Sequence, residues 1–134
     1  MYKRDLVTAE IQKLAQALAR IIGLKLEGKK EESDFLFSST LEEEFELSYS
    51  NLLEISDDEF HKFLIEKEFS ADKLELLSKL FYTHIDHFEN IKETQIVAQK
   101  LLALYQFIEK QHHIQSFEGL SRQRQIKSFL EKYS

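Results

Sequence analysis

The sequence contains no cysteine, no proline and no tryptophan, and only three glycines among its 134 residues. Without cysteine there is no disulfide, no thiolate metal site and no cysteine nucleophile. Three glycines are too few for the turns of a many-stranded β protein. No apolar run approaches the roughly 20 residues that a membrane-spanning helix needs. The composition therefore predicts an all-α protein, and the length predicts a single helical domain over residues 1–134.

The lack of cysteine and of a long apolar stretch near the N-terminus also predicts the cellular compartment of the protein. No uninterrupted apolar stretch follows Lys3 and Arg4, because polar residues return by Thr8 and Glu10, so we expect no signal peptide. A chain without cysteine fits a reducing compartment. We therefore expect a cytoplasmic protein with no membrane partner.

Charge is distributed unevenly along the chain, whose net charge is −6. Residues 31–59 hold eleven acidic residues and no lysine or arginine, whereas residues 1–30 have a balance of +4. Residues 119–134 have a local balance of +3, carried by Arg122, Arg124, Lys127 and Lys132. Nucleic-acid-binding domains are normally basic overall. We therefore expect no nucleic-acid partner and interpret the basic end as a solvated or internally paired helix face.

Apolar residues recur at the +3 and +4 steps of amphipathic helices. The first helix is predicted to begin at Asp5 as its cap and to end at Gly23 or Gly28. A second helix is predicted over residues 29–45, either continuous or broken at Ser38–Thr40, since Thr40 and Glu43 have capping-box spacing.

Later helix starts are marked by serine caps. Residues 46–55 indicate a turn of helix, and Ser56 with Glu59 forms a capping box for the next helix. Ser70 opens another helix, a turn follows around Asn90, and residues 94–112 repeat the helical pattern. Ser116 is predicted to cap a last helical segment with irregular geometry near Gly119. Short connections imply six or seven helices with antiparallel neighbours.

Short stretches at the two ends of the chain resemble a family of small, uncharacterised bacterial helical proteins described as tetratricopeptide-like. They are Arg4-Asp5, Ile11, Leu14 and Leu18–Ile21 at one end, and Leu101–Tyr105, Arg122-Gln123 and Ile126 at the other. The resemblance implies helical hairpins packed as one right-handed stack or bundle, and it implies no activity. The sequence departs from a strict 34-residue repeat, because it has no proline and Leu102 replaces the expected glycine.

Four residues could serve as metal ligands. His84 and His87 lie three positions apart, at the boundary and on the surface of their predicted helix, and Glu109 with His112 matches half of a di-iron Glu-x-x-His signature. A complete site needs a second such motif, which the sequence lacks, and two further glutamates that project inward. We expect no metal and no cofactor, and keep a metal-binding helical bundle as the alternative function.

The acidic block also contains apolar residues on more than one side of its predicted helix. Phe35 and Phe37 flank Leu36, so one of these side chains is expected to remain exposed beside the acidic residues Glu42, Glu43, Glu44 and Glu46. An exposed apolar patch rimmed by acids is typical of a partner site. With no catalytic constellation in the sequence, we expect a non-catalytic adaptor or scaffold that binds a protein or peptide. Self-association is a further option.

Overall fold

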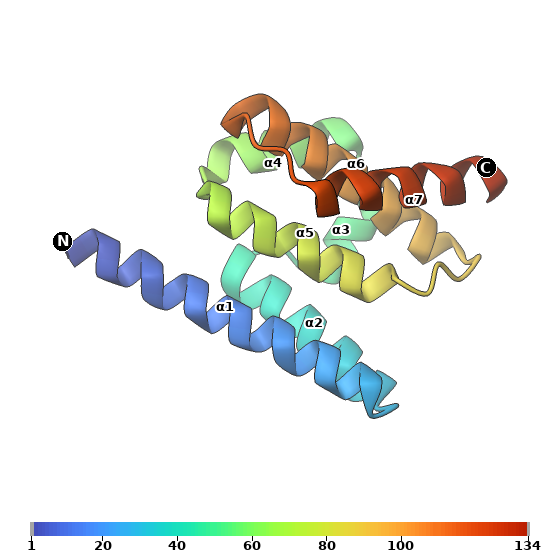
Figure 1. Cartoon of the computed structure of the whole chain (residues 1–134), viewed down its shortest axis with the longest axis horizontal. Coiled ribbons are helices and arrows are strands. Elements are labelled where there is room, and N and C mark those ends of the chain that lie inside the picture. Colours follow the sequence, from blue (N-terminus) through green and yellow to red (C-terminus); the bar gives the residue numbers. More distant parts are fainter. Residues whose placement is uncertain (1, 134) are drawn as a thin grey trace. The chain divides into compact units, whose positions relative to one another are not determined.

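The computed structural model describes the backbone of residues 2–133 and the side chains of residues 8–133. Within residues 2–133 the chain forms seven helices and no strand, which confirms the all-α prediction (Figure 1). These helices are α1 (Tyr2–Leu26), α2 (Lys30–Phe45), α3 (Tyr49–Glu54), α4 (Asp57–Lys67), α5 (Ala71–Ile85), α6 (Lys92–His112) and α7 (Phe117–Tyr133). None of the helices within this range has the length and apolar character needed to cross a membrane.

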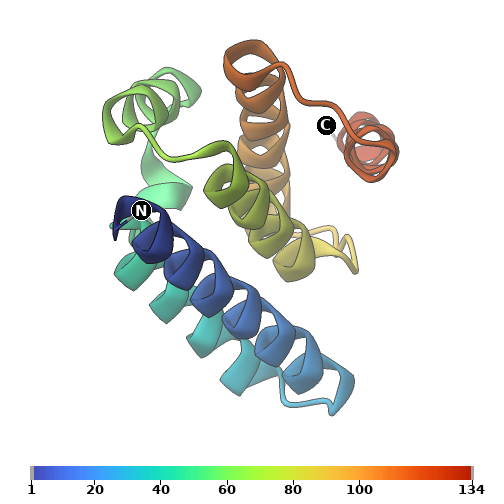
Figure 2. The same cartoon turned by 60° about the vertical axis from the view of Figure 1, so that its left-hand side comes forward.

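The helices form two compact units, Met1–Asn51 and Leu52–Ser134. In the first unit α1 and α2 run antiparallel, side by side in both views (Figures 1 and 2). Each helix buries one apolar stripe with the +3 and +4 spacing predicted from the sequence. The stripe of α1 comprises Leu14, Leu18 and Ile21, and that of α2 comprises Phe37, Leu41 and Phe45. The buried hydroxyl of Ser33 adds a link between the helices by donating to the carbonyl of Ile21 at 3.3 Å.

The ends of α1 differ in part from the sequence prediction. The helix begins at Tyr2, so Asp5 lies inside it and does not act as its cap. Gly23 also lies within the helix, whereas Gly28 follows its end with a φ of 77°. Glycine adopts this left-handed conformation without a Cβ clash, so of the two predicted terminators Gly28 is the one that the chain uses.

Of the two alternatives for the second helix, the continuous one is confirmed and the break is wrong. α2 is continuous through Ser38–Thr40, and Thr40 is buried inside it instead of capping a new helix. Burial of Phe37, Leu41 and Phe45 extends on both sides of this polar stretch. Such packing of one apolar face outweighs a local capping signal.

The second unit contains α4 to α7. α5 and α6 pack as an antiparallel pair, and both α4 and α7 contact α6 (Figure 1). Their core is formed by fully buried apolar side chains from all four helices, including Phe60, Leu77, Phe81, Val97, Leu101, Leu104 and Ile126. Phe63 of α4 and Phe88, which follows α5, are only half-buried.

Serine caps begin α4 and α5, as predicted, whereas α6 follows Ile91 without a side-chain cap hydrogen bond. In the capping box the Ser56 hydroxyl accepts from the Glu59 N–H at 3.1 Å, and the Glu59 carboxylate accepts from the Ser56 N–H at 3.1 Å. This backbone hydrogen bond lowers the pKa of Glu59. The Ser70 hydroxyl accepts from the N–H of Lys73 at 3.2 Å. α7 is continuous through Gly119, so the predicted irregularity there is wrong.

Candidate functional site

Among residues 8–51 of the first unit, the outer face of α2 carries the most exposed aromatic side chain. Phe35 is 75% exposed, whereas Phe37 is 1% exposed and makes an edge-to-face contact with Tyr49 at 5.8 Å between ring centroids. One of these phenylalanines therefore lies on the surface, as the sequence predicted, and Phe37 belongs to the core and not to a surface that a partner could contact.

The acidic residues of α2 lie in different environments. Glu42 and Glu43 are exposed, and neither makes an ion pair with another residue in the range 8–133. Glu44 accepts from Lys13 of α1 at 3.0 Å, and this hydrogen bond raises the pKa of Lys13. Glu46 ends the helix in the left-handed conformation, with a φ of 54°. Near the C-terminal end of α2, the carboxylates without an ion pair among the described residues are therefore those of Glu42 and Glu43.

A shallow groove between α1 and α2 places Phe35 next to further charged residues. Its volume is about 440 Å³, and it is lined by Arg20 and Leu24 of α1 and by Glu31, Glu32, Phe35 and Leu36 of α2. Helical geometry puts Glu31, Phe35 and Glu42 on one stripe, because residues four and seven positions apart share a helix face. This stripe, which we call the acidic Phe35 face, combines an exposed ring with carboxylates on both sides along the helix.

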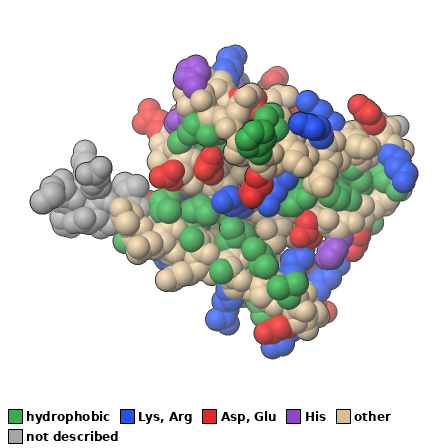
Figure 3. Space-filling model, viewed as in Figure 1, with side chains coloured by type: hydrophobic (Ala, Val, Ile, Leu, Met, Phe, Trp, Pro, Cys, Tyr) green, Lys and Arg blue, Asp and Glu red, His purple; other side chains and the backbone are tan. Residues whose placement is uncertain are grey.

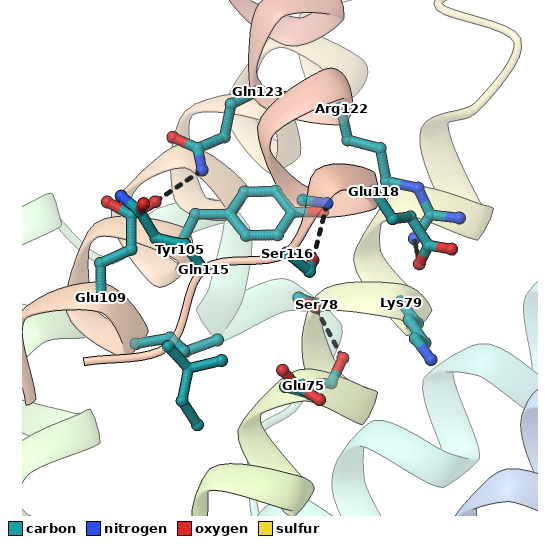
Figure 4. Close-up of a pocket in the computed structure, with 13 residues that line it drawn as sticks. Glu75, Ser78, Lys79, Tyr105, Glu109, Gln115, Ser116, Glu118, Arg122 and Gln123 are labelled. Atoms are coloured by element: carbon teal, nitrogen blue, oxygen red, sulfur yellow. Dashed lines mark hydrogen bonds and ion pairs between the residues drawn. The ribbon is translucent and has the colours of Figure 1, made fainter. Parts of the chain in front are cut away.

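The second unit contains a more enclosed pocket of about 230 Å³ between α5, α6 and the start of α7 (Figure 4). The Tyr105 ring extends from α6 toward Ser116, which precedes α7. Gly119 permits this approach, because a Cβ there would lie 3.0 Å from the Ser116 hydroxyl oxygen and 3.6 Å from the Tyr105 ring. Burial raises the pKa of the Tyr105 phenol, so it stays protonated at neutral pH.

The polar groups of this pocket mostly bind one another. Arg122 pairs with Glu118 at 2.9 Å, and the Gln123 amide donates to the Glu109 carboxylate at 2.9 Å (Figure 4). The Ser78 hydroxyl donates to the Glu75 carbonyl at 2.6 Å. Ligand pockets usually measure about 300–1,000 Å³ and direct free polar groups inward. The first and third of these contacts lie within α7 and within α5, and the Gln123–Glu109 bond joins α7 to α6. Because these polar groups are already bound to one another, we interpret the pocket as structural.

A third concavity, which we call the α7 groove, lies between α7 and the segment after α5. It measures about 570 Å³ and is lined by Phe88, Arg124, Gln125, Ser128, Phe129, Lys132 and Tyr133. The ring of Phe129 lies 5.4 Å from that of Phe88 and 5.3 Å from that of Tyr133. Sequence reasoning grouped the cations of this region but missed the groove. The groove could have been predicted from two neighbouring stripes with four-residue spacing on the last helix. One stripe contains Arg124, Ser128 and Lys132, and the other contains Gln125, Phe129 and Tyr133.

The four candidate metal ligands are not assembled into a site. Glu109 is occupied by Gln123, and His87 is 76% exposed with its imidazole 3.8 Å from Asp86. His84 is half-buried, as expected for a boundary residue, and His112 lies in the last turn of α6. Across the described side chains, no three histidine, aspartate or glutamate residues are grouped so that they could hold a metal ion.

No protein-family model, no curated protein and no solved structure matches this chain. Functional inference therefore rests on the surfaces and contacts described above.

Proposed function

We propose that the protein is a non-catalytic helical interaction module, built from tetratricopeptide-like hairpins, whose acidic Phe35 face binds a basic protein or peptide. The observation that carries the proposal is Phe35, a large apolar side chain that remains 75% exposed on a regular, well-packed helix. Aromatic side chains are typical binding hot spots when a partner removes them from water.

Charge defines the class of partner. Glu42 and Glu43 are free of ion pairs within the described part of the chain, and Glu31 and Glu32 line the groove beside Phe35. Arg20 lines the same groove, but the two glutamates outnumber it. A partner with lysine or arginine around an apolar pocket would be attracted and oriented by this arrangement, whereas an acidic partner would be repelled.

The proposal is tested by titrating the isotopically labelled protein with two synthetic amphipathic helices. One helix carries lysine and arginine on its polar face, and the other carries glutamate at the same positions. We expect the basic helix to bind and to shift the amide resonances of α2 selectively. Phe35→Ala should weaken this binding about tenfold or more, as for a central aromatic hot spot.

Phe117→Ala is the matched control, because Phe117 is also an exposed phenylalanine, at 94%, but lies on α7. It should leave the affinity for the basic helix unchanged. Equal binding of the two helices, or resonance shifts that avoid α2, would contradict the proposal.

A further inference from the structure

The α7 groove has the chemistry expected of a surface that receives an acidic, aromatic-bearing helix. Three rings in tilted contact, those of Phe88, Phe129 and Tyr133, form its apolar part. The Phe88 backbone adopts a φ of 49°, a conformation that bulky residues rarely take, and its ring is held by contacts with Phe129 and with Tyr82 at 6.1 Å. The apolar part is therefore fixed in place before any partner binds.

Two cations line the same groove without acidic partners, and the Lys132 ammonium lies 5.4 Å from the centre of the Tyr133 ring. Arg124 and Lys132 are exposed, and neither forms an ion pair with any residue between positions 8 and 133. Lys and Arg side chains stand along α7 on the face drawn in Figure 3. Eight residues separate the two cations, which is about 12 Å along a helix. The α7 groove thus offers apolar surface between two free positive charges.

The acidic Phe35 face has the complementary arrangement. Phe35 lies between Glu31 and Glu42, which are separated by eleven residues, or about 16 Å along the helix. Long arginine and lysine side chains can reach across the difference between the two spacings. The chain therefore carries both halves of one contact, an exposed ring between carboxylates and a ring cluster between cations.

We propose that the α7 groove of one copy binds the acidic Phe35 face of a second copy, with the Phe35 ring against the half-buried Phe88 and the exposed Tyr133 and the carboxylates near Arg124 and Lys132. This inference rests on the proposed function, because it names a second copy of the chain as the basic partner. The contact joins two different surfaces, so two copies joined by it leave a free acidic Phe35 face on one copy and a free α7 groove on the other. Association is therefore open-ended and forms rings or short chains instead of stopping at a symmetric dimer.

The first test measures the mass of the purified protein by sedimentation equilibrium from micromolar to millimolar concentration. A contact of one helix in one groove is small, so we expect weak association with average mass that rises beyond that of a dimer. Added salt should weaken it, because the carboxylates and cations are exposed and screened. Phe35→Ala should reduce the association constant about tenfold or more, and Phe117→Ala should leave it unchanged.

The second test exchanges the charges. One variant carries Glu31→Lys and Glu42→Lys, and the other carries Arg124→Glu and Lys132→Glu. Each variant alone should be monomeric, because its two faces then have like charge. The mixture should associate again, because the reversed face of one variant complements the reversed groove of the other. Circular dichroism of each variant shows that the helices are retained.

The outcomes separate this inference from the proposed function. A wild-type monomer at all concentrations, or a mixture that fails to associate, would overturn the second-copy proposal. If the basic synthetic helix still shifts α2 in that case, the proposed function stands with a different partner. Binding of an acidic helical peptide or of single-stranded RNA in the α7 groove, without self-association, would likewise assign the groove to another ligand and refute this inference.

Discussion

Tyr82 of α5 contacts two residues of α7, and its removal tests how α7 is anchored to the rest of the second unit. The Arg122 guanidinium lies 4.1 Å from the centre of the Tyr82 ring, and the Tyr82 hydroxyl donates to the Gln125 side chain at 2.6 Å. α7 has few buried residues, namely Gln123, Ile126 and Phe129. Polar contacts around Tyr82 should therefore contribute a large share of its attachment.

The magnitude follows from the exposure of the groups. Cation–π pairs contribute about 0.5–1 kcal/mol at exposed sites and about 2 kcal/mol when desolvated. The Arg122 side chain is 24% exposed, which places the coupling to Tyr82 near 1 kcal/mol. The hydroxyl bond to Gln125 adds a net contribution of about 0.5–1.5 kcal/mol, nearer the lower value because it is exposed.

A double-mutant cycle with Tyr82→Leu and Arg122→Met isolates the coupling, and Tyr82→Phe removes only the hydroxyl bond. Native-state hydrogen exchange of the α7 amides reports the free energy of local opening. A coupling of about 1 kcal/mol corresponds to about fivefold in exchange rate. Exchange in α1 and α2 should stay unchanged and serves as the internal control. Strictly additive effects, or unchanged α7 protection in Tyr82→Leu, would refute the reasoning.

Three further predictions concern helix ends and buried charge. Gly23→Ala should raise the urea-unfolding free energy by about 0.5–1 kcal/mol, because the added methyl group meets no atom within 4 Å. Gly28→Ala should lower it by about 1–2 kcal/mol, because φ is 77° there, and two changes of the same sign would contradict this account. Glu59 has a lowered pKa in the folded state, so its contribution is complete above the unfolded pKa of about 4.3 and is lost as pH falls through the folded value. The stability difference between wild type and Glu59→Gln, measured by urea unfolding, should therefore shrink with acidification, and a constant difference would count against the capping box. Lys100→Met should change the unfolding free energy by less than about 1 kcal/mol, because among the described residues the buried Lys100 ammonium pairs with the Asp57 carboxylate alone, whose side chain is 65% exposed. A loss of about 3 kcal/mol or more would show that the pair is essential.

Local patterns in the sequence predicted most of the fold because helices depend on neighbours three and four positions away. The starts at Ser56 and Ser70 followed from capping chemistry that operates within one turn. The same chemistry misled at Thr40, where the capping-box spacing is present but the helix continues. The Thr40 side chain is buried, so whether the helix continues there depends on how α2 packs in the first unit, and no local sequence pattern encodes that packing.

The surfaces were predictable only in part. Phe35 and Phe37 lie two positions apart, so the sequence predicted that one ring would be exposed but left open which; the structure buries Phe37 and exposes Phe35. By contrast, Tyr82 and Gln125 are 43 residues apart, and their hydrogen bond depends on how α7 docks. The α7 groove depends on the same docking, since Phe88 reaches Phe129 only across that interface.

Exposure alone does not select a docking residue in this protein. Phe117 is more exposed than Phe35, at 94%, yet its neighbour Glu118 is paired with Arg122 and offers no free charge. Phe35 differs because its helix stripe carries Glu31 and Glu42 on either side, and Glu42 makes no ion pair within the described residues. An apolar side chain without a charged frame can bind in many orientations and to many surfaces. The carboxylates of Glu31 and Glu42 restrict Phe35 to partners that combine an apolar pocket with cations. This restriction makes the exposed ring a specific interaction site.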